Sequence, residues 1–233
     1  RDRARSKLSA TPAAALLRGL QGLLVRIYDA PAAHDVHDFL VTDALRAAEL
    51  SGRAQPPSTD EQLLLAEGAD GLELSLYVDA EVLRRLATRC PLHALDERNL
   101  ADYCTALEGV SHFHYVVWNA DSTREISLLE LELQAEVDKY ASALSLLLAQ
   151  REGRFPAELF HRLFEGVRFL PQLAEAERAR YEEAHRYAAR FCRRLEERFL
   201  RARRARPEAL LAELRRFYRL GSQSKLRHAA QWS

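Results

Sequence analysis

The stretch that most constrains the fold is residues 110–140, VSHFHYVVWNADSTREISLLELELQAEVDKY. Residues 112–118 are rich in aromatic and β-branched side chains, which favour a half-buried strand. Turn-forming residues follow at 119–123, and 126–134 then alternates leucine with glutamate, a period of two that places the apolar side chains on one face of a strand. These patterns predict a hairpin with strands near 111–118 and 125–133, and a helix from about residue 134.

The rival interpretation of this stretch is a helix that begins with Ser127-x-x-Glu130, the pattern of a capping box. A helix turns by about 100° per residue, so Leu131 would lie about 200° from Leu129, on the opposite side. We therefore favour the hairpin, with Leu129, Leu131 and Leu133 buried and the glutamates on the other face.

A second hairpin is predicted by residues 61–67 and 71–78, which flank the turn sequence Gly68-Ala69-Asp70-Gly71. Helical spacing and capping residues predict helices elsewhere. Asp79 and Asp96 are candidate helix caps, Gly109 is expected to stop the helix after Asp96, and residues 222–233 are expected to fray. The predicted helices begin at Pro12 and cover about 35–50, 80–89, 97–108, 134–150 and 156–169, with a long helix from Pro171 and another from Pro207 to about 221.

These elements predict a predominantly helical α+β fold. Its sheet has four mainly antiparallel strands, formed by the two hairpins, with helices on one face. The predicted domains are 1–152, an α+β domain with strands near 61–67, 71–78, 111–118 and 125–133, and 153–233, a helical C-terminal region packed on it. The two parts can also form one continuous domain.

Composition and cysteine usage indicate a cytoplasmic globular protein. The chain has 233 residues, 48% of them hydrophobic and 29% charged, which is ordinary for such a protein. The three cysteines are far apart and odd in number, a pattern typical of a reducing compartment. No run reaches the roughly 18 apolar residues of a membrane span. We expect no membrane association, no signal peptide and a bacterial-like cytosolic setting.

Charge is unevenly distributed, although the formal net charge is zero. Residues 171–233 carry 16 basic and 8 acidic side chains, whereas residues 8–170 are strongly acidic. Such asymmetry indicates an anion-binding surface. The basic helix could contact nucleic-acid phosphates, dock on the acidic part of its own chain or of a second copy, bind a partner protein, or remain a solvated face. The candidate anion-binding residues are Arg186, Arg190, Arg194, Arg198, Arg201 and Arg204.

On the hairpin interpretation, imidazoles, carboxylates and rings share the outer face of the sheet. His112-x-His114 could hold a metal with a glutamate as the third ligand. The competing interpretation is a solvated face with cross-strand His–Glu pairs, and we expect no tightly held metal there or at His34 and His37. Glu132, Glu136 and Tyr140 are four residues apart, but the predicted change from strand to helix would separate them. The candidate ligand or metal residues are His112, His114, Trp118, Glu130, Glu132 and Tyr77.

The sequence contains no motif of a specific reaction. It has no G-x-S-x-G elbow, no P-loop, no G-x-G-x-x-G and no C-x-x-C. We therefore expect a non-catalytic binding or scaffold protein that needs no cofactor and whose basic C-terminal helix docks on an anionic surface. The alternative is a metal- or ligand-binding enzyme that uses the His112, His114, Glu130 and Glu132 face.

Overall fold

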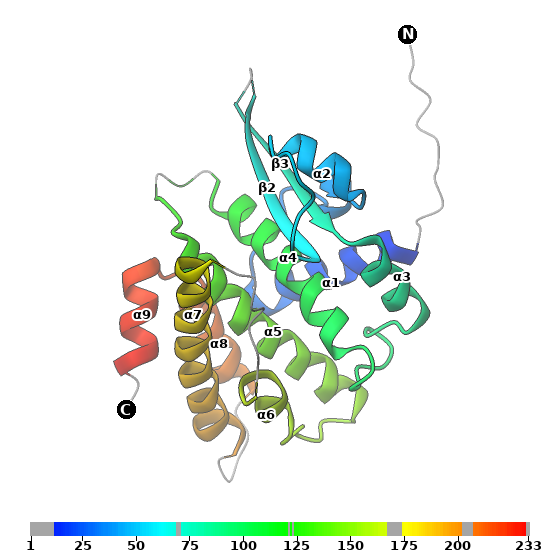
Figure 1. Cartoon of the computed structure of the whole chain (residues 1–233). Coiled ribbons are helices and arrows are strands. Elements are labelled where there is room, and N and C mark those ends of the chain that lie inside the picture. Colours follow the sequence, from blue (N-terminus) through cyan, green and yellow to red (C-terminus); the bar gives the residue numbers. More distant parts are fainter. Residues whose placement is uncertain are drawn as a thin grey trace.

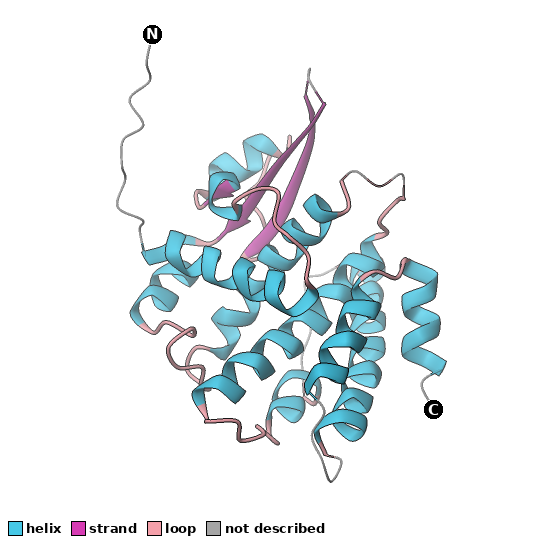
Figure 2. Cartoon of the chain, turned by 180° about the vertical axis from the view of Figure 1, so that it is seen from behind, coloured by secondary structure: helices cyan, strands magenta, loops and turns pink. Residues whose placement is uncertain are grey.

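The computed structural model describes residues 12–68, 71–120, 122, 124–166, 174–201 and 207–231. Within these residues the fold is predominantly helical with one small mixed sheet, so the predicted α+β class with mostly helices is confirmed (Figure 1, Figure 2). The helices are α1 (Pro12–Tyr28), α2 (Ala44–Leu50), α3 (Ala80–Thr88), α4 (Leu100–Trp118), α5 (Leu128–Gln150), α6 (Leu159–Phe164), α7 (Glu175–Leu195), α8 (Pro207–Tyr218) and α9 (Ser222–Gln231); the strands are β1 (Leu40–Val41), β2 (Glu61–Gly68) and β3 (Gly71–Val78).

The sheet contains the hairpin predicted for residues 61–78. Strands β2 and β3 pair antiparallel, with Leu63 opposite Leu76. Strand β1 pairs with β3 in parallel, so that the strand order is β1-β3-β2. Within the described residues the sheet therefore has three strands and is mixed, and the prediction of four mainly antiparallel strands is wrong.

Helices cover both faces of the sheet, not one face as we predicted. Helix α2 packs on one face, where Ala47 contacts Leu64 and Tyr77. Helix α4 packs on the other face, close to Leu76 (Figure 1). The predicted helix over residues 35–50 is interrupted, because a 3₁₀ turn (Val36–Phe39) and β1 precede α2.

Gly109 lies in the interior of α4, although we predicted that it would end a helix. A Cβ atom at this position would lie 2.8 Å from Leu76 Cδ1 and 3.0 Å from Glu61 Oε2. Both separations are too short for a normal contact, so the glycine allows the sheet to approach the helix closely. The residue marks a close contact between α4 and the hairpin.

The predicted strand 111–118 is the second half of α4. This part of the helix is buried on several sides, with Val110, Phe113 and Tyr115 all inaccessible to solvent. Its neighbours are α1, α3, α5 and the sheet. A helix enclosed in this way is apolar almost all round, so it loses the one-sided pattern that identifies a surface helix. The aromatic and β-branched residues reflect burial, not a pleated surface.

The predicted strand 125–133 is the start of α5, and the capping interpretation is correct. Ser127 is the N-cap residue, and its hydroxyl accepts a hydrogen bond from the Glu130 N–H. Leu131 is only partly buried, whereas Glu130 and Glu132 are 1% and 6% exposed. The alternation of leucine and glutamate misled us because α5 is enclosed on opposite sides. Its buried glutamates face charged groups, Arg124 of the preceding loop for Glu130 and His112 of α4 for Glu132.

The C-terminal helices complete the core. Helix α7 packs along α5 and continues into a π-helical turn (Glu196–Leu200), and α8 packs against α1. Residues 222–231, which we expected to fray, form α9 at the edge of the molecule (Figure 1). Packing between α1 and α8 crosses the predicted boundary at residue 152; the division into domains stays a prediction. None of the described helices is both long and apolar enough to cross a membrane.

Candidate metal centre

Buried charged side chains gather where α4 and α5 face β2 and α7. Strand β2 contributes one carboxylate, α4 a carboxylate and an imidazole, α5 two carboxylates and a lysine, and α7 an arginine and a second imidazole. Helical spacing brings the residues of α4 and those of α5 to one side of each helix, because positions three or four apart are neighbours. We call this set the His112 cluster: Glu61, Glu108, His112, Glu132, Glu136, Lys139, Arg180 and His185.

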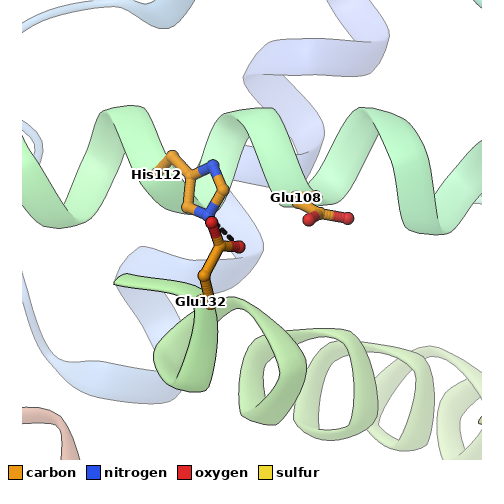
Figure 3. Close-up of side chains that lie close together, drawn as sticks. All are labelled: Glu108, His112 and Glu132. Atoms are coloured by element: carbon orange, nitrogen blue, oxygen red, sulfur yellow. Dashed lines mark ion pairs between the residues drawn. The ribbon is translucent and has the colours of Figure 1, made fainter. Parts of the chain in front are cut away.

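Three residues of the His112 cluster have the geometry of metal ligands. Glu108 and His112 lie one turn apart on α4, and Glu132 reaches them from α5 (Figure 3). One possible ligand atom from each residue lies within 4.8 Å of the other two. His112 Nε2 is 3.5 Å from Glu132 Oε2. Only small movements would bring these atoms to the roughly 2.0–2.2 Å of a bond to zinc or a similar ion.

The His112 ring is held in a setting typical of a metal ligand. The residue is 5% exposed, and Nε2 has no hydrogen-bond partner among the described residues. On the other side of the ring, Nδ1 lies 3.8 Å from Glu61 Oε2. Metal-bound histidines commonly face a carboxylate through the nitrogen that does not bind the metal. Glu61 is placed to orient the ring, while Nε2 points toward Glu132.

The charges around His112 favour a cation. Burial lowers the pKa of His112, but Glu132 and Glu61 outweigh burial and raise it to about 9. Burial raises the pKa of Glu61, and the nearby Glu108 and Glu132 raise it further, against the opposing effect of His112. The carboxylates contribute to both upward shifts, because clustered carboxylates favour any positive charge placed among them, a proton included.

Lys139 and Glu136 form the adjoining part of the His112 cluster. Lys139 Nζ lies 2.6 Å from Glu108 Oε2 and 2.7 Å from Glu136 Oε1. His185 Nδ1 lies 2.7 Å from Glu136 Oε2. Burial opposes ionisation of Glu136, but Lys139 and His185 outweigh it and lower the pKa of Glu136 to about 2. Glu136 is therefore a fully ionised carboxylate with two close positive or polar partners.

Comparisons of this chain with protein-family models, with curated proteins and with solved structures find no match. Geometry is therefore the basis for assigning a role. One imidazole nitrogen and two carboxylates form a mixed ligand set, which suits Mn²⁺, Fe²⁺, Co²⁺ or Zn²⁺ better than the all-oxygen ligand sets typical of Ca²⁺ and Mg²⁺.

A second buried polar group lies on the opposite face of α5. Asp138 accepts a hydrogen bond from Ser111 Oγ at 2.6 Å through one oxygen and from Gln134 Nε2 at 2.6 Å through the other. Lys225 of α9 donates to Gln134 Oε1 and lies over the ring of Tyr115. We call Ser111, Gln134, Asp138 and Lys225 the Asp138 network.

The structure separates most of the candidate residues that we had placed on one sheet face. Only His112 and Glu132 come together, and they do so across two helices. Tyr77 packs against α2, with its hydroxyl directed to Asp79 at 3.3 Å. The other three candidates lie near α8 or the loop before α5: His114 is buried beside Tyr218, Trp118 packs on Tyr218, and Glu130 forms an ion pair with Arg124 and accepts a hydrogen bond from Tyr115.

The sequence interpretation missed Glu108 and Glu61. Glu108 and His112 have the spacing of four that makes helix neighbours, as do Glu132 and Glu136. The first pair was hidden by the expectation that Gly109 ends the helix. Glu61 reaches His112 through tertiary packing alone, for which the sequence has no local signal.

The candidate anion-binding arginines differ in their surroundings. Arg186, Arg190 and Arg198 are exposed on α7 and its π-helical turn. Arg194 donates a hydrogen bond to the carbonyl of Ala229, and Arg201 pairs with Glu196 at 3.1 Å. Arg204 lies outside the described residues.

Proposed function

We propose that this chain is a metal-binding protein that holds one divalent transition-metal ion between α4 and α5, with Glu108, His112 and Glu132 as ligands. The observation that carries the proposal is His112 Nε2, which is buried, has no hydrogen-bond partner among the described residues and points toward Glu132 at 3.5 Å. This is the metal-binding alternative of the sequence analysis, moved from a sheet face to a pair of helices. It departs from our expectation of no tightly held metal.

Without a metal ion, His112 Nε2 is a buried polar atom that has no hydrogen-bond partner among the described residues. Buried polar atoms in proteins are nearly always hydrogen bonded, and leaving one without a partner costs about 1–3 kcal/mol. A bond to a metal ion would satisfy His112 Nε2. The same ion would neutralise Glu108 and Glu132, while Glu61 would stabilise the ring from the other side.

Charge balance supports a single divalent ion. The His112 cluster contains the carboxylates Glu61, Glu108, Glu132 and Glu136, opposed by the fixed cations Lys139 and Arg180. In the state that can bind a metal, with all four carboxylates ionised and both histidines neutral, two negative charges remain. One divalent cation neutralises them, and such pairing is what makes buried charge tolerable.

Metal titration of the chelator-treated protein tests the proposal. We expect binding of one Co²⁺ or Mn²⁺ per chain, with the visible absorption of Co²⁺ reporting the coordination geometry of the bound ion. His112→Leu and Glu132→Gln should each weaken binding by at least about tenfold, because each removes a ligand. His114→Leu is the matched control, since it also removes a buried imidazole from α4. Failure of the wild-type protein to bind any of Mn²⁺, Fe²⁺, Co²⁺ and Zn²⁺ would overturn the proposal.

For the basic C-terminal segment we propose docking on its own chain. Hydrogen bonds from Arg215 and Arg219 to the carbonyls of Ile27, Tyr28 and Asp29 support this role. The three-fold variant Arg190→Gln, Arg194→Gln, Arg201→Gln should then melt slightly earlier, since exposed pairs contribute about 0–1 kcal/mol each. Salt-sensitive retardation of DNA or RNA by the wild type, lost in this variant, would favour the nucleic-acid interpretation instead.

A further inference from the structure

We propose that Gly109 is a positioning residue of the metal centre: because it has no side chain, Glu61 of β2 can lie against α4 and face the ring of His112. The inference rests on the proposed function and adds to it how the ring of one ligand is held. Its basis is that the carboxylate oxygen which fills the space beside Gly109 is the same oxygen that faces His112 Nδ1.

Gly109 lies in α4 between two of the proposed ligands, directly after Glu108 and three residues before His112. Residues three apart lie on the same side of a helix, so Gly109 faces the same neighbours as His112. A glycine in a helix interior is unfavourable relative to alanine, because its backbone has more freedom to lose on folding. A contact that only glycine permits would offset this cost.

Two side chains of the hairpin fill the space that a larger residue would take at position 109. A Cβ atom there would lie 2.8 Å from Leu76 Cδ1 and 3.0 Å from Glu61 Oε2. Leu76 belongs to β3 and is fully buried, whereas Glu61 is the first residue of β2. The leucine contact serves packing, and the carboxylate contact reaches the metal centre.

Glu61 Oε2 is the atom that links this close approach to the metal centre. It lies 3.8 Å from His112 Nδ1, too far for a hydrogen bond but close enough for electrostatic attraction at a buried site. A negative charge beside Nδ1 favours the tautomer in which Nδ1 carries the proton, so that Nε2 keeps its lone pair for an ion. Nε2 in turn faces Glu132 Oε2 at 3.5 Å.

The backbone of Glu61 is fixed, so crowding at Gly109 would have to move the side chain of Glu61. The Glu61 carbonyl accepts a hydrogen bond from Thr59 Oγ1 at 2.7 Å, and Glu61 pairs with Val78 across the hairpin. The carboxylate is the flexible end of this side chain. A methyl group at position 109 would therefore push Oε2 away from its place beside His112, while β2 stays paired with β3.

The test is a double-mutant cycle in the full chain, with Co²⁺ as the probe and competition with a chromophoric chelator as the measure of affinity. Glu61→Ala should weaken Co²⁺ binding by roughly 10–100-fold, the usual effect of losing a carboxylate that orients a ligand. Gly109→Ala in the wild-type background should weaken it by at least about threefold, because the carboxylate is displaced and not removed. In the Glu61→Ala background it should have no further effect, since no carboxylate is left to displace.

Free energies of unfolding, measured without metal, separate packing from positioning. Leu76 is crowded in both backgrounds, so Gly109→Ala should lower stability whether or not the Glu61 side chain is present. Gly22→Ala in α1 is the matched control, since its new Cβ would meet only Arg26 Nη1, at 3.5 Å. This control should leave the Co²⁺ affinity unchanged.

The outcomes separate this inference from the proposed function. A wild-type chain that binds no Co²⁺ overturns the inference, and one that binds none of Mn²⁺, Fe²⁺, Co²⁺ and Zn²⁺ overturns the proposed function as well. If the wild type binds Co²⁺ and Gly109→Ala binds it equally tightly, the metal site stands and the role of Gly109 is wrong. An equal loss of affinity in both backgrounds would show that Gly109 acts through packing alone, which would likewise overturn the inference.

A second background decides the matter if Gly109→Ala does not fold. Leu76→Val removes the Cδ1 atom that lies closest to position 109 and leaves Glu61 unchanged. In this background Gly109→Ala should still weaken Co²⁺ binding by at least about threefold relative to Leu76→Val alone. Unchanged affinity there contradicts the inference, and so does a Glu61→Ala variant that binds Co²⁺ as tightly as the wild type, a result that requires no change at Gly109.

Discussion

The two faces of α5 carry two buried polar groups that differ in how completely their atoms are paired. In the Asp138 network, both carboxylate oxygens of Asp138 accept short hydrogen bonds, and Lys225 donates to Gln134. In the His112 cluster, His112 Nε2, Glu61 Oε2 and Arg180 Nε have no hydrogen-bond partner among the described residues. Both groups lie in the same core, so burial alone does not explain the difference.

The difference separates a group that stabilises the fold from one suited to a ligand. A paired buried network rigidifies a core, and its central carboxylate, Asp138, is costly to remove. A group with surplus like charges and unpaired atoms lowers stability, and such groups are expected at functional sites. The following changes test this distinction, in order of decreasing expected effect.

Asp138→Ala should cause the largest loss of stability. It leaves Ser111 and Gln134 without their partner and removes a nearby negative charge from buried Lys225. Removing one member of a buried charged group costs about 3–5 kcal/mol, measured as the free energy of unfolding in urea. Asp102→Ala, which breaks an exposed pair with Arg85, should cost only about 0–1 kcal/mol. Similar losses in the two variants would contradict the comparison.

Lys225→Met should stabilise the protein by about 1–3 kcal/mol at pH 6, because an apolar side chain replaces a buried charge. Burial lowers the pKa of Lys225 to about 7, below its usual value of 10.5. Between these two pH values the unfolded chain binds a proton that the folded chain does not, so wild-type stability rises with pH through this window. The advantage of the variant should therefore shrink from pH 7 to pH 10.

The control for this prediction is Lys139→Met. Lys139 is also buried, but two carboxylates hold it. Its replacement leaves Glu108 and Glu136 unpaired and should destabilise the protein at pH 6. Chemical unfolding at several pH values measures the stability of both variants. If both substitutions stabilise the protein at pH 6, or both destabilise it, the two lysines do not differ as proposed.

Gly109→Ala should destabilise the protein by roughly 1–2 kcal/mol, because crowding against Leu76 and Glu61 outweighs the gain in helix propensity. Gly22→Ala in α1 is the matched control. Its new Cβ would meet only Arg26 Nη1, at 3.5 Å, so this variant should be up to about 1 kcal/mol more stable than wild type. Thermal melting of the two variants checks the prediction, and stabilisation by both would exclude a rigid contact at Gly109.

Glu61→Gln should have the smallest effect. In the metal-free protein it should raise the free energy of unfolding by about 0.5–1 kcal/mol, because a neutral amide replaces a buried carboxylate whose Oε2 lacks a hydrogen bond. Glu196→Gln should change the free energy of unfolding in the opposite direction. Glu196 is also buried, but Tyr140 and Arg201 pair with it, so its loss should cost about 1–3 kcal/mol. Unfolding in urea with a chelator present measures both variants.

Local signals in the sequence were enough to predict the elements that lie at the surface or have clear caps. The 61–78 hairpin follows from its turn and its alternation, and α3 follows from Asp79, whose carboxylate accepts from the N–H groups of Glu81 and Val82. Helices α4 and the start of α5 were mistaken for strands because central helices are buried on several sides and lose one-sided periodicity. Without that periodicity, the β-forming residues of these helices are the strongest local signal, and they favour a strand.

The candidate site could be predicted only in part, for the same reason. His112 and Glu132 were among the predicted residues, but the strand interpretation placed them beside His114 and Glu130, which lie elsewhere in the core. Glu108 was hidden by a glycine that allows close packing and does not end the helix. The position of Glu61 depends on how the hairpin docks on α4, and no pattern within either segment reports that contact.

The contacts between α8 and α1 have a consequence for the order in which the chain folds. Arg215 donates to the carbonyl of Ile27 and Arg219 to that of Tyr28, across sequence separations of 188 and 191 residues. The entropy lost in closing a loop grows with its length, and contacts between distant residues form slowly. The C-terminal end of α1 thus obtains its hydrogen-bond partners only when α8 docks. We expect this docking to be a late step of folding, after the hairpin and the α4–α5 pair have formed.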